Sequence, residues 1–147
     1  MKHLDFEPMK YLGSFLADRD KYPFMRTYFQ GLEVREHENY YLTNKEKGIG
    51  AIYNEDQVLK VFQIYFNGMD GLPTFQGALP KGITARDSPE DVLQKLDGID
   101  YESGGGKAVA VLGIDSWWKY HFQNGYLHVT FKDEKILRLM SLGMDFK

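Results

Sequence analysis

Two stretches of this 147-residue chain repeat one pattern of apolar and polar residues at a spacing of 78 positions, from 52 to 130. Residues 52–64 read IYNEDQVLKVFQI, and residues 130–142 read TFKDEKILRLMSL. In each, a short polar segment separates two runs of strand-forming residues, which is the pattern of a β-hairpin. Because a hairpin must bury its apolar face against another layer, the repeat favours a fold built on a sheet.

One more strand is expected before each hairpin. The segment 38–44 (ENYYLTN) precedes the first hairpin, and the segment 116–122 (SWWKYHF) precedes the second. Both are short and rich in aromatic residues, which are common in strands. Each half of the chain therefore predicts three successive strands.

A helix is expected ahead of the strands in each half. Over 88–99 the signals are clear, because Ser88 suits the N-cap and Gly98 suits the end of a helix. The segment 22–32 follows this outline more loosely, and residues 8–17 allow an earlier short helix.

The predicted fold class is α+β, with two tandem helix-plus-β-hairpin repeats that form one antiparallel sheet and place their helices on one face. We expect a single domain over 1–147, with halves at about 8–70 and 76–147. The Gly- and Pro-rich segment 66–88 joins them. Chance likeness between two amphipathic hairpins is the alternative to a true repeat.

Composition limits the classes of function. Aromatic residues make up 15% of the chain, with ten Tyr and ten Phe, so some are expected at the surface as binding anchors. The net charge of −3 argues against a nucleic-acid partner and is compatible with a basic protein partner. The chain has no cysteine, which excludes disulfides and thiolate chemistry. No apolar stretch is long enough for a signal peptide or a membrane span, so we expect a cytoplasmic protein.

No motif for catalysis or cofactor binding is present. SGGGK (103–107) lacks the earlier glycine and the following Ser or Thr of a phosphate loop, so we interpret it as a surface loop. His121 and His128 can approach each other across a hairpin, but a zinc site needs a third protein ligand. We therefore predict no catalytic residue, no metal and no cofactor.

Trp117 and Trp118 are adjacent, so in a strand their side chains point to opposite faces. Alternation places Trp118 on the apolar, core-facing side. The second face then carries Trp117, Lys119, His121, Tyr126 and His128. We predict a partner-binding patch there, because exposed aromatics among polar residues are typical of interaction sites. Two alternatives stay open: the Gly-rich segment 101–113 covers Trp117, or a bulge shifts the strand register.

A second candidate patch is acidic and suits the cationic side chains of a nuclease cleft. Its residues are Asp97, Asp100, Tyr101, Glu102 and Asp115.

The order of several short motifs resembles a bacterial immunity-protein family of contact-dependent growth inhibition and related polymorphic toxin systems. The residues that carry the resemblance are 47–65 (KGIGAIYNEDQVLKVFQIY), 75–83 (FQGALPKGI), 87–96 (DSPEDVLQKL), 111–120 (VLGIDSWWKY) and 126–139 (YLHVTFKDEKILRL).

The resemblance implies an antitoxin that binds the C-terminal domain of a cognate toxin, often a nuclease, and occludes its active site or substrate path. The family pattern has Trp, two polar residues and Tyr where Trp117 to Tyr120 stand. Trp118 departs from this pattern, which implies that Trp117 is the inner tryptophan, contrary to the alternation argument. No contact residue is carried over from the family.

Two rival functions remain from other classes. One is a small enzyme that uses a carboxylate or histidine in a cleft of the sheet. The other is a small-ligand-binding adaptor, for which a deep apolar pocket lined by Tyr and Phe is the expected evidence. The sequence does not predict the oligomeric state.

Overall fold

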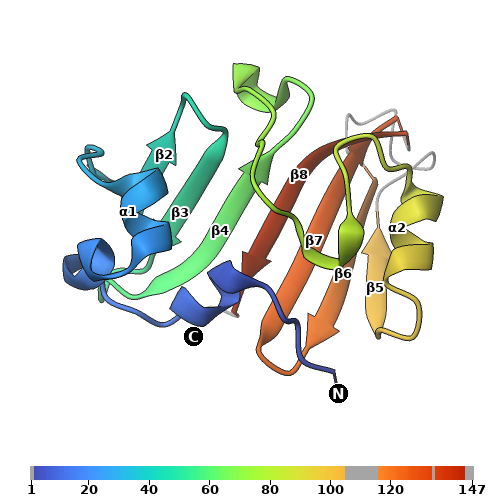
Figure 1. Ribbon diagram of the computed structural model, residues 1–147, viewed down its shortest axis with the longest axis horizontal. Coiled ribbons are helices and arrows are strands. Elements are labelled where there is room, and N and C mark those ends of the chain that lie inside the picture. Colours follow the sequence, from blue (N-terminus) through green and yellow to red (C-terminus); the bar gives the residue numbers. More distant parts are fainter. Residues whose placement is uncertain (1, 105–115, 134, 145–147) are drawn as a thin grey trace.

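The computed structural model describes residues 2–104, 116–133 and 135–144, and their strands form one antiparallel sheet. The strand order is β1-β2-β3-β4-β8-β7-β6-β5 (Figure 1). The first half contributes β1 (Arg35–Glu36), β2 (Tyr40–Asn44), β3 (Ile49–Tyr53) and β4 (Leu59–Tyr65). The second half contributes β5 (Tyr101–Gly104), β6 (Ser116–Phe122), β7 (Gly125–Lys132) and β8 (Ile136–Gly143).

The hairpins β3–β4 and β7–β8 share one register at the 78-residue spacing of the sequence. Tyr53 pairs with Leu59, and 78 positions later Phe131 pairs with Leu137. In both hairpins the register shifts directly before the first residue of this pair. Strands β4 and β8 pair at the centre of the sheet, so the strand order of the second half mirrors that of the first.

The helices lie over one face of the sheet. Helix α1 (Pro23–Phe29) lies over the first half, and α2 (Pro89–Lys95) lies beside β5 on the same side (Figure 1). The 3-10 helices η1 (Glu7–Tyr11) and η2 (Leu16–Lys21) also lie on this side, between the sheet and solvent. Two further 3-10 turns are η3 (Met69–Gly71) and η4 (Pro80–Gly82). Among the described residues, none of the helices combines the length and apolarity needed to cross a membrane.

Helix α2 begins with a reciprocal capping box. The Ser88 hydroxyl accepts a hydrogen bond from the Asp91 backbone N–H at 3.2 Å, and the Asp91 carboxylate accepts one from the Ser88 N–H at 3.0 Å. These bonds satisfy backbone donors that a helix start leaves free. The helix is also tied to the preceding loop, because Lys95 donates to the buried Asp87 carboxylate at 2.7 Å and to the Gly82 carbonyl at 2.8 Å.

The core fills the space between the sheet and the helices. Along β7, Leu127, Val129 and Phe131 are fully buried, whereas the residues between them are partly exposed. Strand side chains alternate between faces, so this pattern identifies the helix-covered face. Helix α1 adds Met25 and Phe29 to the core, and α2 adds Val92, with Leu96 directly after its last residue.

The α+β class and the predicted strands are confirmed, but the chain has shorter helices and more strands than the sequence predicts. Helix α2 ends at Lys95, with Gly98 in a left-handed turn at φ +80° beyond it. In place of a helix over 8–17, the chain forms η1 and η2. The edge strands β1 and β5 were not predicted, because both are short, polar and paired on one side only. Ser103 and Gly104, assigned to a loop from sequence, belong to β5.

Candidate functional site

The sheet face turned away from α1 and α2, here called the open face, carries the five residues of the first predicted patch. Directly paired residues of adjacent strands share a face. Lys119 pairs with His128, and His121 pairs with Tyr126. Trp117 lies on the same face two residues before Lys119, so the patch spans β6 and β7. The β6–β7 register runs from Ser116 to Phe122 in consecutive pairs, so the shifted-register alternative does not apply.

Trp117 lies flat between two neighbours on the open face. Its ring stacks on the His128 imidazole, with centroids 5.3 Å apart and an interplanar angle of 20°. On the other side, a Cβ built on Gly104 of β5 would meet the Trp117 ring at 2.5 Å, so only glycine lets the indole lie this close to the strand. Trp117 is therefore held in place by its strand neighbours and is only partly buried.

The Tyr126 ring is a second aromatic ring that lies flat on the open face. A Cβ on Gly143 would meet the Tyr126 ring at 2.9 Å. The Lys119 ammonium lies over the Tyr126 ring, 4.5 Å from its centroid, which is a cation–π geometry. Two aromatic rings and one cation thus form a preorganised surface.

The histidines of the patch differ in their surroundings. His121 Nε2 lies 3.9 Å from the Glu102 carboxylate at the exposed end of the patch. Burial, aided by the Lys119 charge, lowers the pKa of His128, and Glu102 opposes this shift. Because this environment disfavours the charged imidazolium, the neutral form of His128 is the one favoured beside the indole.

Trp118 is on the opposite face, as alternation predicts. It packs against the core edge-to-face with Phe131, with centroids 5.5 Å apart, and pairs with the buried Val129. The inner position that the family pattern implies for Trp117 is therefore wrong. Trp118 is nevertheless partly buried, not fully enclosed, because it lies near the β5 edge of the sheet.

The second predicted patch is not brought together as one surface. Glu102 pairs with Lys119 and lies on the open face, so it joins the first patch. Tyr101 is on the helix side of β5, 51% exposed, and its ring contacts Tyr120 at 5.3 Å. Asp97 and Asp100 are exposed in the α2–β5 connection. Asp115 lies outside the described residues, as does the 105–113 part of the segment proposed to cover Trp117.

The first half of the open face has a different chemistry. It carries Tyr41 and Thr43 of β2, Ile52 of β3, and Gln63 and Tyr65 of β4. The Tyr65 ring lies 3.8 Å from a Cβ built on Gly50, and its hydroxyl donates to the Gln63 side chain at 3.0 Å. Arg35 of β1 pairs with Tyr41 and so adds one cation to this half, but the imidazole groups of the described strands lie only on β6 and β7. The candidate binding patch is therefore assigned to β6 and β7.

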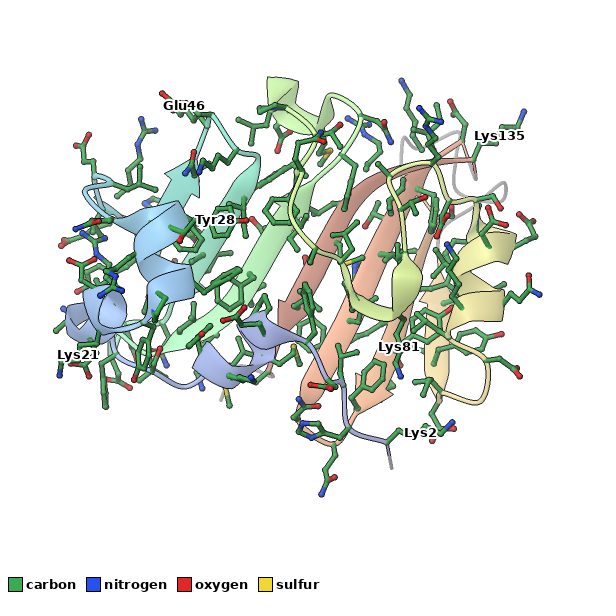
Figure 2. The ribbon with its side chains drawn as sticks, in the orientation of Figure 1. Lys2, Lys21, Tyr28, Glu46, Lys81 and Lys135 are labelled. Carbon is green, nitrogen blue, oxygen red and sulfur yellow. The ribbon has the colours of Figure 1, made fainter. Side chains whose placement is uncertain are left out.

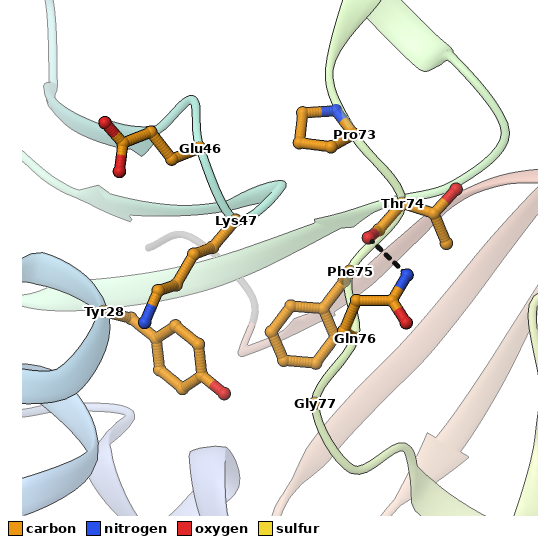
Figure 3. Close-up of a pocket in the computed structure, with 8 residues that line it drawn as sticks. All are labelled: Tyr28, Glu46, Lys47, Pro73, Thr74, Phe75, Gln76 and Gly77. Atoms are coloured by element: carbon orange, nitrogen blue, oxygen red, sulfur yellow. Dashed lines mark hydrogen bonds between the residues drawn. The ribbon is translucent and has the colours of Figure 1, made fainter.

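A pocket of about 430 Å³ lies on the helix side of the sheet, and sequence reasoning missed it (Figure 3). Tyr28 of α1, Lys47 of the β2–β3 turn and Phe75 of the long connection line it, from three separate segments. The sequence signal was weak: Asn44 and Gly48 flank a polar turn, but nothing local shows what that turn meets.

The described residues hold no group of three or more His, Asp or Glu side chains placed to bind a metal ion. No family model, curated protein or solved structure matches this chain.

Proposed function

We propose that this protein is an immunity protein, a stoichiometric inhibitor that binds a cognate toxin domain through the open face. The observation that carries the proposal is the arrangement of Trp117, Lys119, His121, Tyr126 and His128 on two adjacent strands. Interface hot spots are enriched in Trp and Tyr, and rigid anchors lose little conformational entropy on binding. Stacking on His128 and the contact with Gly104 restrict the Trp117 ring before any partner arrives.

Charge at the β5 end of this surface favours a basic partner. The exposed acidic residues around α2 and β5 are Glu90, Asp91, Asp97, Asp100 and Glu102. Among the cations nearby, Lys95 is engaged by Asp87 at 2.7 Å, whereas Lys2 lies beside Gly98 and Arg86 is exposed just before α2. Glu102 lies on the open face itself, whereas the other four acidic residues belong to α2 and its connection to β5, so their charge acts on a basic nuclease domain at longer range and raises the association rate. The proposed inhibitor acts in the cytoplasm by occlusion, without catalysis of its own.

We also propose that the two halves are tandem copies of one unit. The shared register of β3–β4 and β7–β8 supports this, as does the pairing of β4 with β8. Gln63 pairs with Ser141, and these residues are 78 positions apart, so each is the equivalent of the other. A repeat related by a two-fold axis through this pair accounts for all three observations. On this proposal the candidate binding patch of β6 and β7 belongs to the second copy.

Co-expression with the toxin domain encoded immediately upstream of its gene tests the inhibitor proposal. We expect the protein to restore growth of cells that produce the toxin domain and to co-purify with it at one-to-one stoichiometry. A toxin domain that remains lethal and elutes separately from the folded protein refutes the proposal.

A further inference from the structure

The Tyr28–Lys47–Phe75 pocket is built by a hydrogen-bonded framework, independent of the open face. Asn44 holds two of its walls: its Nδ2 donates to the Tyr28 carbonyl at 2.8 Å, and its Oδ1 accepts from the Lys47 N–H at 3.0 Å. The third wall is fixed to the sheet, because the Phe75 N–H donates to the Tyr65 carbonyl at 3.0 Å. The pocket is therefore formed before a ligand enters.

Two glycines let the walls approach. Gly48 has φ +69°, and a Cβ there would lie 2.1 Å from the Pro73 carbonyl oxygen. A Cβ on Gly77 would lie 2.3 Å from the Phe75 ring and 2.8 Å from the Tyr28 hydroxyl. Side chains at either position would push the long connection away from the sheet or fill the space beside the two rings.

The interior offers two aromatic surfaces and one cation. The rings of Tyr28 and Phe75 are in contact at 5.5 Å and tilted by 49°, so they form a continuous apolar wall. The Lys47 ammonium lies 5.4 Å from the Tyr28 ring centroid (Figure 3). Among the described residues, no carboxylate forms an ion pair with Lys47. Glu46 also lines the pocket, at its rim, and its side chain extends outward from the tip of the β2–β3 turn (Figures 2 and 3).

We propose that this pocket binds an aromatic carboxylate. The ring of the ligand packs on Tyr28 and Phe75. The carboxylate of the ligand forms an ion pair with the Lys47 ammonium, which replaces part of the cation–π contact between Lys47 and Tyr28. Gln76 lines the same pocket, where its Nε2 donates to the Thr74 carbonyl at 3.1 Å (Figure 3), and the second hydrogen of that amide is the one offered to the other carboxylate oxygen. The volume of about 430 Å³ is within the range of small-molecule sites and exceeds a single benzene ring.

The same chemistry has two sources, a free aromatic acid or the C-terminal aromatic residue of a peptide. The probe for the first is 3-phenylpropionate, and the probe for the second is a pentapeptide ending in Phe with a free carboxyl group. The neutral counterparts are 3-phenylpropionamide and the C-terminally amidated peptide. Binding is measured by calorimetry and by chemical-shift mapping of backbone amides on the full chain.

We expect both acids to shift the backbone amides of residues 74–77 and to bind at least about tenfold more tightly than their neutral amide counterparts, which corresponds to the loss of one charge-assisted contact. Lys47→Met should reduce the affinity for each acid to that of its amide, whereas Lys45→Met, on the same turn outside the pocket, should not. Glu46→Gln should strengthen binding. Tighter binding of the peptide identifies a chain terminus as the source, and similar affinities identify a small acid.

Equal affinity of acid and amide overturns the proposal, as does an unchanged affinity in a folded Lys47→Met variant. Shifts confined to the open face around Trp117 also overturn it. Because the two sites use different residues, failure of this test leaves the inhibitor proposal standing, and failure of the co-expression test leaves the pocket standing.

Discussion

The Trp117 indole and the His128 imidazole stack across β6 and β7, with ring centroids 5.3 Å apart and planes 20° from parallel. Their strands pair Trp117 with Thr130 and Lys119 with His128, so the two rings are diagonal neighbours on one face. Diagonal cross-strand contacts are within reach of aromatic side chains. The contact holds the Trp117 and His128 rings flat against each other on the open face.

The two adjacent tryptophans should have opposite effects when truncated. Trp118→Ala removes a ring that packs on Phe131 and the core, so we expect the free energy of unfolding to fall by about 3 kcal/mol. Trp117→Ala removes a partly exposed ring, and the loss should stay near 1 kcal/mol. Urea unfolding followed by circular dichroism measures both. Equal losses in the two variants would contradict the assignment of the faces.

The pH dependence of stability should report on His128. Burial and the Lys119 charge lower the pKa of folded His128 below its ordinary 6.5. The unfolded chain therefore binds more protons between these two values, and stability falls as the pH drops through 6.5 toward the folded pKa. His128→Gln should flatten this part of the profile. Urea unfolding at about pH 7.5 and about pH 5.5 makes the comparison. An unchanged slope in the variant would show that His128 is not the group responsible.

The strands of the two hairpins and β6 could be predicted well from the sequence, because their alternation of apolar and polar residues is strong and local. SWWKYHF matches β6 residue for residue, and the N-cap of α2 is at Ser88 as expected. The edge strands β1 and β5 could not be predicted in this way. Their pairing depends on the neighbouring strands β2 and β6, which is a tertiary property that a polar dipeptide or tetrapeptide does not encode.

The ion pair between the buried Asp87 and the exposed Lys95 should matter most at neutral pH. Burial alone would raise the pKa of Asp87, but hydrogen bonds from Lys95 and Thr84 outweigh it and hold the pKa below the ordinary 3.8. Its stabilising contribution is thus present above 3.8 and is lost as the pH falls toward the folded pKa. Asp87→Asn should cost about 2 kcal/mol at pH 7, because Lys95 loses its partner.

Lys95→Met and the double variant are the controls for that measurement. A double-mutant cycle isolates the coupling between Asp87 and Lys95 from their separate contacts with Thr84 and Gly82. A coupling energy of zero would show that the pair does not hold α2 to the loop before it.

Gly48→Ala should destabilise the chain by at least about 2 kcal/mol, because it combines a left-handed backbone with a collision at the Pro73 carbonyl. Gly31→Ala is a matched control: its φ of +73° is close to the +69° of Gly48, but a Cβ there meets nothing within 4 Å. The difference between the two variants in urea unfolding measures the collision alone. Similar losses in both would indicate that the long connection moves freely away from the β2–β3 turn.

The candidate sites show where sequence reasoning loses information. Strand alternation alone predicted that Trp117 and His128 share one face, because the backbone of a strand points successive side chains to opposite faces. It did not separate Tyr101 from Glu102 in the acidic patch, since that needed the strand assignment of β5. The pocket at Tyr28 and Phe75 is formed by a helix and a loop that are more than 40 positions apart in the sequence. A local sequence pattern does not show that two such distant segments lie side by side.

The affinity for a toxin domain, taken from any that is encoded immediately upstream of the gene, is the most direct test of the proposal that the open face binds one. Biolayer interferometry should show Trp117→Ala weakening the complex by at least about thirtyfold, or about 2 kcal/mol. Phe15→Ala, at an exposed aromatic outside the open face, should leave the affinity unchanged. Tight binding that survives Trp117→Ala in a folded variant would contradict the proposal that this face holds the toxin.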